Sequence, residues 1–354
     1  MSRRLLVVTT VHQSDDVRIR SKLIATLASD WDITYASRIP GPSDPNGFTW
    51  LPLPGNRLRR WIKASATLMS SRWSLVAIHD PELVPAGIAR SLRGRATLLD
   101  LHENLPAQIR HKPWIPSILR PVLAWVSGRM LRWAESTMTV TLAEKNYQSL
   151  FRRDHPVLEN YLLVDDLPDP VPPSPKPFLA YVGDITVQRG AFMAVEAAAG
   201  AEVGLVMVGR VTPAELRDEL AERANRLGVD LTMTGPLPHS QAMARVAGAV
   251  GGLSPLEDVP NYRNSLPTKI LEYLALGLPV LASDLPGTRI VTDGRAGVTL
   301  VAPGDANAWS QAGRVVMSDP ELRLAAQSAA DEIRQRYRWP SERVLSVYRA
   351  AVPG

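Results

Sequence analysis

Short runs of aliphatic and β-branched residues alternate along the chain with segments of helical periodicity. The apolar runs occupy 5–11, 32–37, 75–80, 96–103, 137–141, 178–184, 203–209, 230–235, 249–254, 279–284 and 297–302. Apolar residues at three- and four-residue spacing stand near 18–29, 191–199, 213–227 and 267–276. Such alternation is typical of parallel sheets that helices cover on both faces. The pattern predicts an α/β protein with doubly wound parallel sheets.

A proline-rich segment interrupts this alternation near the middle of the chain. Six prolines stand between Pro168 and Pro177, where neither a helix nor a central strand can form. We therefore expect two Rossmann-like domains, at 1–166 and 178–336, with a linker at 167–177 between them. In such sheets ligands bind at the carboxyl ends of the strands. We expect the active site in a cleft between the two domains.

The composition fits a globular protein of this size. The chain has 354 residues, of which 45% are apolar and 21% charged, close to the usual values of about 45–50% and 25%. No apolar run approaches the roughly 18 residues of a membrane span. Cysteine is absent, which excludes disulfides and thiolate sites and is typical of a reducing compartment. We expect a cytoplasmic protein.

Sequence signals for bound cofactors are missing. No G-x-G-x-x-G follows the first predicted strand, and the phosphate-binding pattern G-x-x-x-x-G-K-[ST] does not occur. The six histidines are scattered, and no pair of histidines or carboxylates stands at metal-ligand spacing on a predicted helix. We therefore expect neither a resident cofactor nor a metal ion.

Positive charge and tryptophan concentrate in the first half. Residues 1–166 carry a net charge of +7 and the remainder −2, and seven of the nine tryptophans precede residue 134. Nucleic acid and an anionic membrane are both partners for a basic surface, but the basic residues are spread out and no nucleic-acid-binding motif occurs. An anionic membrane surface is the partner this composition favours, and nucleic acid is not expected.

The segment 112–133 combines basic, apolar and tryptophan residues most clearly. Its apolar residues recur at helical spacing, at Ile115, Ile118, Leu119, Val122, Val126, Met130 and Trp133. Arginines at 120, 129 and 132 and Trp114 flank them, a composition suited to the interface of an anionic bilayer. An ordinary helix packed on a sheet would show the same periodicity, and both interpretations stand. The segment from Arg57 to Lys63 forms a second patch of this kind.

Residues 264–284, NSLPTKILEYLALGLPVLASD, carry the most specific chemistry. Asn264, Ser265 and Pro267 predict the start of a short helix that ends before Gly277. Unpaired amides at a helix start attract phosphate. Lys269 adds a cation there, where only an anionic ligand would favour it. Glu272 stands three residues on, and its carboxylate could accept hydrogen bonds from ribose hydroxyls. A capped helix with a solvated Lys–Glu pair is the alternative.

This segment resembles the retaining glycosyltransferases of family 4, which have the GT-B fold. The matching positions are Ser265, Leu266, Pro267, Glu272, Gly277, Pro279 and Val280. Asn264 stands where most members have a carboxylate, and the pattern NS-x-P-x-K-x-x-EY is similar to that of some branches. The resemblance implies that Glu272 binds the ribose, and that Asn264, Ser265 and Leu266 contact the diphosphate or the sugar.

The resemblance extends over nearly the whole chain. The segment 181–190 is similar to the family's donor-binding loop, which implies that Gly183 approaches the pyrophosphate and that Arg189 holds it. Asp184 departs from the arginine that many members have there, and Lys269 would compensate. The segment 337–350 resembles the family's C-terminal helix, which implies that residues 337–354 cross back to the first domain.

Three segments of the first domain resemble the family's acceptor side. Residues 12–28 are similar to its first loop and helix, with Arg18 at the basic position and a weak role for His12. Residues 98–106 contain His102, which corresponds to the histidine that reaches donor sugar and acceptor, followed by Glu103. A structural histidine at a strand end is the alternative for His102. The segment 78–85 is also similar, and we expect structural roles for His79 and Asp80.

The resemblance implies transfer of a sugar from a nucleotide-diphosphate sugar to an acceptor hydroxyl, with retention of configuration and no metal ion. Arg189, Lys269 and His102 would form the catalytic set. The acceptor is a glycan, a lipid-linked molecule or a small molecule, in cell-surface glycan, glycolipid or natural-product synthesis. Two other classes stay open, a non-catalytic protein that binds nucleotide sugars and a nucleotide-sugar epimerase.

Overall fold

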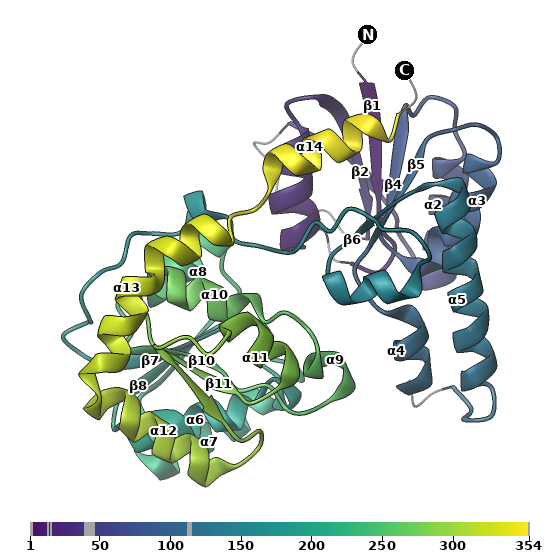
Figure 1. The fold of residues 1–354 in the computed structure, drawn as a ribbon. Coiled ribbons are helices and arrows are strands. Elements are labelled where there is room, and N and C mark those ends of the chain that lie inside the picture. Colours follow the sequence, from purple (N-terminus) through teal and green to yellow (C-terminus); the bar gives the residue numbers. More distant parts are fainter. Residues whose placement is uncertain (1–2, 13, 15, 39–46, 112–114, 353–354) are drawn as a thin grey trace. The chain divides into compact units, whose positions relative to one another are not determined.

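The computed structural model describes residues 3–12, 14, 16–38, 47–111 and 115–352. The chain divides into two compact units. One contains the residues up to Asn160 together with those from Trp339 onward, and the other spans Tyr161–Arg338 (Figure 1).

The first unit is built on a parallel six-stranded sheet. Its spatial order is β3-β2-β1-β4-β5-β6. The strands are β1 (Arg3–Val8), β2 (Trp31–Ser37), β3 (Thr49–Pro52), β4 (Leu75–Ile78), β5 (Thr97–Leu101) and β6 (Thr139–Leu142). The winding reverses between β1 and β4, and in doubly wound sheets ligands bind at such a point, beyond the carboxyl ends of the strands.

Helices connect these parallel strands. A π-helical segment, Val17–Ile24, runs into the single turn α1 (Ala25–Leu27), and the side chain of Asp16 caps it by accepting from the Ile19 amide at 3.0 Å. The other helices are α2 (Arg57–Leu68), α3 (Val84–Ser91), α4 (Leu105–His111), α5 (Arg120–Thr137) and α14 (Ser341–Ala350). π-Helical turns occur often at functional sites, and this one carries Arg18.

The second unit repeats the same winding. Its sheet order is β12-β11-β10-β7-β8-β9, so the winding reverses between β7 and β10. The strands are β7 (Phe178–Val182), β8 (Gly204–Val208), β9 (Leu231–Gly235), β10 (Gly251–Ser254), β11 (Val280–Ser283) and β12 (Val298–Val301). The helices are α6 (Ala191–Ala201), α7 (Leu216–Leu227), α8 (His239–Val246), α9 (Pro260–Arg263), α10 (Thr268–Ala275), α11 (Pro286–Thr292), α12 (Ala306–Ser318) and α13 (Pro320–Arg336). The predicted α/β class with two Rossmann-like sheets is confirmed.

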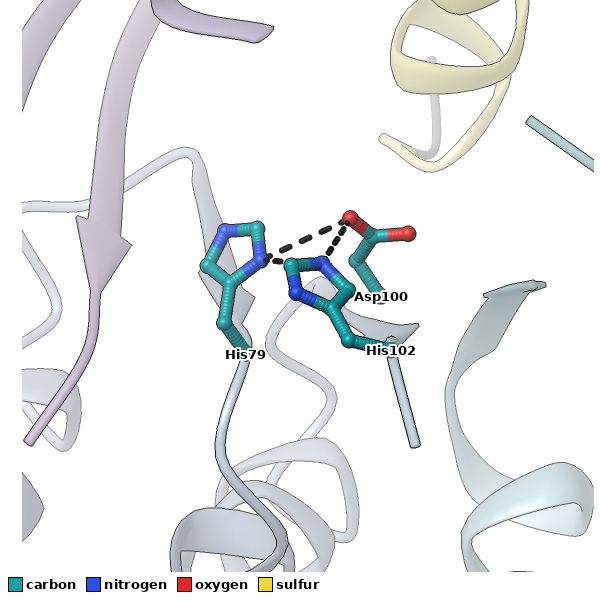
Figure 2. Close-up of side chains that lie close together, drawn as sticks. All are labelled: His79, Asp100 and His102. Atoms are coloured by element: carbon teal, nitrogen blue, oxygen red, sulfur yellow. Dashed lines mark hydrogen bonds and ion pairs between the residues drawn. The ribbon is translucent and has the colours of Figure 1, made fainter. Parts of the chain in front are cut away.

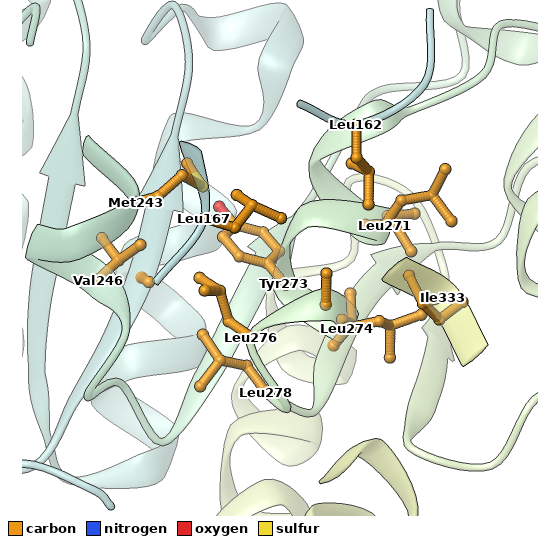
Figure 3. Packing of buried hydrophobic residues seen from close by; sticks show 14 of the residues in the cluster. Leu162, Leu167, Met243, Val246, Leu271, Tyr273, Leu274, Leu276, Leu278 and Ile333 are labelled. Atoms are coloured by element: carbon orange, nitrogen blue, oxygen red, sulfur yellow. The ribbon is translucent and has the colours of Figure 1, made fainter. Parts of the chain in front are cut away.

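One apolar core of the second unit fixes α10 on the sheet (Figure 3). The hydroxyl of Tyr273 accepts a hydrogen bond from the Val182 amide at 2.8 Å. Its ring lies so close to β10 that a Cβ at Gly252 would come within 2.2 Å of it. The glycine therefore lets α10, which carries Lys269 and Glu272, pack closely against β10.

The unit boundary differs from the expected linker. Leu162 and Leu167 lie buried in the core of the second unit, before the prolines. The Ser174 amide then donates to the Gly248 carbonyl at 2.8 Å. The proline-rich segment is therefore part of the second unit. Its prolines exclude regular structure, as expected, but its backbone still finds partners.

The last residues pack on the first unit. Trp339 is buried, and its indole donates to the Thr26 hydroxyl at 3.0 Å. Arg349 on α14 pairs with Asp30 at 2.5 Å.

The edge strand β3 was not expected from the sequence. In the described part of the chain, no helix has both the length and the apolar character that crossing a membrane requires.

Candidate functional site

Two cations of the second unit meet at the end of β7. Gly183 follows this strand with a φ of +119°, and a Cβ there would lie 3.6 Å from Arg189 Nη1 and 3.9 Å from Lys269 Nζ. Gly190, after Arg189, approaches the backbone of Pro255 too closely for a Cβ. The structure therefore brings Gly183, Arg189 and Lys269 together, as the donor-site hypothesis requires.

The environment of Lys269 is unusual for an ammonium group. The side chain is buried, and its Nζ has no hydrogen-bond partner among the described residues. It lies 4.3 Å from the centre of the Tyr181 ring. Burial, and next the positive charge of Arg189, lower the pKa of Lys269 to about 7, although Glu272 and Asp184 act against this shift. Because a buried charge without a partner is unfavourable, this site favours the binding of an anion.

The segment 264–266 lies beside this pair. A Cβ at Gly287 in α11 would come within 2.3 Å of the Ser265 carbonyl, so α11 supports the backbone at this point. The Ser265 hydroxyl donates to the Tyr262 carbonyl at 3.3 Å, and the Tyr262 ring centre lies 5.7 Å from the Arg189 guanidinium carbon. Leu266 packs on the core next to Asn264 and Ser265.

Glu272 has a partner that the sequence did not reveal. Its Oε1 lies 2.9 Å from Nε2 of His239, the first residue of α8. Nδ1 of the same ring lies 3.8 Å from a carboxylate oxygen of Asp166. Both His239 and Glu272 are largely buried, so the carboxylate is held in one orientation. No local pattern marks His239, because it stands far from Glu272 along the chain.

A second cluster lies in the first unit, at the end of β5. Figure 2 shows the rings of His79 and His102 with the carboxylate of Asp100 beside them. Asp100 Oδ2 lies 2.6 Å from His102 Nε2 and 3.5 Å from His79 Nδ1. The two rings approach each other at 3.2 Å between His79 Nδ1 and His102 Nε2. The carboxylate thus fixes the orientation of the predicted acceptor-side histidine.

Arg18 completes this cluster from the π-helical segment. Its guanidinium donates to both carboxylate oxygens of Asp100, at 3.0 and 3.3 Å, and to the Leu158 carbonyl at 2.7 Å. Burial alone would raise the pKa of Asp100, but Arg18 and His102 hold it well below its usual value. Burial lowers the pKa of His102 against the opposing effect of Asp100.

His12 and Glu103 lie near the cluster. The His12 ring is 5.4 Å from that of His102, and its Nδ1 lies 3.1 Å from Asp16. Burial opposes its charge, but the hydrogen bond to Asp16 and the negative charges of Asp16, Asp80 and Glu103 together raise the pKa of His12. The Asp80 carboxylate accepts from the Thr9 hydroxyl at 2.8 Å and from the Val11 amide at 3.2 Å, which agrees with the structural role expected for it. Glu103 is exposed.

His79, Asp100 and His102 are also spaced as metal ligands can be. One ligand atom from each lies within 4.8 Å of the others, the one such group among the described residues. The Arg18 guanidinium already neutralises Asp100 from within hydrogen-bond distance. A divalent ion would stand beside this buried cation, so the residues do not fit a metal site. The expected absence of a metal stays a prediction.

Comparisons with known proteins address the second unit most directly. Residues 176–319 match the family described as glycosyl transferases group 1. A D-inositol 3-phosphate glycosyltransferase of Saccharomonospora viridis is 29% identical over 136 residues, which are 38% of this chain and 31% of that protein. The match thus spans about a third of the relative's length.

Solved structures match the whole chain. Sucrose-phosphate synthase from Thermosynechococcus elongatus superposes with a TM-score of 0.72 at 18% identity, covering 99% of this chain and 98% of that one. HepE of Anabaena in complex with UDP-glucose superposes with a TM-score of 0.70 at 13% identity, over 99% and 98%. At such identities the likeness shows the fold. Residues 176–319 are thus similar to group 1 glycosyl transferases, and the chain as a whole has the GT-B fold of the solved structures that it matches.

Proposed function

We propose that this protein transfers a sugar from a nucleotide-diphosphate sugar to an acceptor hydroxyl, with retention of configuration. The observation that carries the proposal is the buried Nζ of Lys269, which has no hydrogen-bond partner in the described part of the chain and lies near Gly183 beside Arg189. A diphosphate would supply the missing partner. The family match at 176–319 and the UDP-glucose complex of the HepE neighbour support this assignment.

The second unit would hold the donor. Arg189 and Lys269 bind the diphosphate with the backbone of Gly183 and Ser265. Glu272 accepts hydrogen bonds from the ribose hydroxyls, with its carboxylate oriented by His239. Negative charge develops on the leaving diphosphate, so the two cations act by electrostatic stabilisation. We propose that no metal ion and no resident cofactor take part.

The first unit would hold the acceptor. His102 contacts the acceptor, and Asp100 holds its ring through an oxygen 2.6 Å from Nε2. His12, Arg18 and Glu103 lie on this side, and the Arg18 Nε lies 3.3 Å from Asp100 Oδ2 and 3.1 Å from His102 Nε2. We propose an acceptor in cell-surface glycan or glycolipid synthesis in the cytoplasm, with natural-product glycosylation as the alternative.

Calorimetry with UDP, GDP, ADP and dTDP, with and without magnesium, tests the donor site. We expect one nucleotide to bind without metal, and Lys269→Met and Arg189→Ala to weaken it strongly. In turnover, loss of either cation should cost about 10²- to 10³-fold. Arg217→Ala, on the exposed surface of α7, is the matched control. If no nucleotide binds, the proposal is wrong.

A turnover assay distinguishes the proposed transfer from two other functions. Asn264 and Asp184 stand at positions that usually carry a different charge in the resembled family, which favours a non-catalytic nucleotide-sugar-binding protein. Donor binding without turnover on a broad acceptor panel would identify it. A changed sugar formed without any acceptor would identify an epimerase.

A further inference from the structure

Helix α5 presents one apolar stripe to the first unit and another to the outside. The buried stripe consists largely of small residues, Ala124, Ser127, Leu131 and Ala134. The periodic residues that the sequence singled out mostly lie elsewhere. Ile118 is 81% exposed, and Val122 is 58% exposed. The interpretation of these residues as the face packed on the sheet is therefore wrong for most of them.

The outward face combines large apolar and aromatic side chains. We call this set the α5 patch: Ile118, Leu119, Val122, Leu123, Trp125, Val126 and Trp133. Trp125 is 66% exposed and Trp133 is 55% exposed. Of the other residues in the sequence pattern, Ile115 is buried and Met130 is half-buried, while Lys112 and Trp114 lie outside the described residues. So much exposed apolar area on α5 and the two residues before it marks an interaction surface.

The exposed charged side chains beside the α5 patch on this helix are positive. No aspartate or glutamate occurs from 104 to 134, a stretch with five lysines and arginines. Arg129 and Arg132 are exposed, and the Arg129 guanidinium carbon lies 6.0 Å from the Trp125 ring centre. Glu135 is buried and accepts from the amides of residues 152 and 153, at 3.0 and 2.8 Å. On the helix itself, nothing acidic offsets the exposed arginines.

We propose that the α5 patch docks on an anionic phospholipid bilayer. Tryptophans and aliphatic side chains would enter the boundary between headgroups and acyl chains, and Arg129 and Arg132 would meet the phosphates. A symmetric dimer through this patch would bring the arginines of two copies together, which disfavours a second copy as the occupant. The docking does not depend on the proposed transfer reaction.

The second basic patch, on α2, is less suited to this role. Arg57 pairs with Glu82 at 2.7 Å, and the Trp61 indole donates to the Glu82 carbonyl at 2.9 Å. Arg60 donates to the Thr10 carbonyl at 3.0 Å. These groups are already used within the first unit, so the α2 patch carries no proposal of its own.

Vesicle flotation with the full chain tests the docking. The probes are vesicles of phosphatidylcholine alone and of phosphatidylcholine with phosphatidylglycerol. We expect binding to the anionic vesicles only. Arg129→Gln with Arg132→Gln should lower the partition coefficient at least about tenfold, since each basic residue near an anionic surface contributes about 1 kcal/mol. Trp125→Ser should also lower it.

Matched variants and light scattering separate the outcomes. Arg217→Gln with Arg226→Gln removes two exposed arginines of α7 and should leave vesicle binding unchanged. Equal binding of the control and the α5 variants would overturn the proposal, as would no binding to anionic vesicles. A dimer in solution that Trp125→Ser dissociates, without vesicle binding, would identify a second copy as the occupant instead.

Discussion

Lys269 shows how burial changes the chemistry of a single side chain. Its position in the sequence suggested an anion-binding cation, but not a pKa of about 7 that burial and Arg189 produce together. A pKa this far below the usual value favours loss of the proton from the free protein near neutral pH. Binding of a diphosphate would restore the charge and raise the pKa again.

Nucleotide affinity should consequently depend on pH. Above pH 7.5 a terminal phosphate, with a second pKa of about 6, is already ionised, so Lys269 dominates the change. Affinity should fall up to about tenfold for each pH unit from 7.5 to 9, with proton uptake on binding. Calorimetry in buffers of different ionisation enthalpy measures both. Lys269→Met should remove the slope, and an unchanged slope would exclude Lys269 from the site.

Asp100 and Arg18 form a buried pair whose loss should be costly. Asn at position 100 would leave the Arg18 guanidinium without its countercharge. Removing one partner of a buried pair typically destabilises by about 3–5 kcal/mol. We expect Asp100→Asn to lower the free energy of unfolding by about 3 kcal/mol in urea denaturation. In the double variant with Arg18→Gln, the free energy of unfolding should fall by less than the sum of the two single losses. Additive losses would show that the pair is not coupled.

At the scale of elements, α10 depends on the glycine it rests against. The sequence predicted this helix near 267–276, and the structure has it at Thr268–Ala275. The expected start at Asn264 and Ser265 is wrong, because Asn264 ends α9 (Pro260–Arg263) and Pro267 is the N-cap of α10 without a side-chain capping bond. How closely α10 packs on the sheet could not be predicted, since the contact between the Tyr273 ring and Gly252 joins distant parts of the chain.

Gly252→Ala should therefore push α10 away from β10. The added Cβ would come within 2.2 Å of the Tyr273 ring, and overpacking of this kind costs about 1–3 kcal/mol. Lys269 should shift with the helix, so nucleotide affinity should fall as well. Gly128→Ala in α5 is the control, because its Cβ would have only an ordinary contact at 3.9 Å and alanine favours helices. Equal stability of both variants in thermal denaturation would refute the packing argument.

At the scale of the whole molecule, the C-terminal residues belong to the unit formed by the first residues. Trp339 lies 5.7 Å from the cationic groups of both Arg18 and Lys22, and it is buried. The resemblance implied such a return of the chain. The local pattern around Trp339 predicts only a helix after it.

Trp339→Ala should therefore weaken the first unit selectively. Truncation of a buried tryptophan typically costs about 3–5 kcal/mol. We expect faster amide hydrogen exchange in β1, β2 and the π-helical segment, with little change in β7 to β12. Hydrogen exchange followed by mass spectrometry measures both units in one experiment. Equal loss of protection in both units would mean that they unfold together.

The sequence by itself predicted the alternation of strands and helices, except for β3, and the two Rossmann-like sheets, and it singled out Arg189, Lys269 and Glu272 as candidates. The alternation follows from hydrophobic periodicity and turn residues, which act between near neighbours along the chain. Only the tertiary structure decided that His239 holds Glu272, that Arg18 neutralises Asp100, and that the α5 patch faces outward. Burial and pairing depend on residues far apart in the sequence, and desolvation acts only once they are packed.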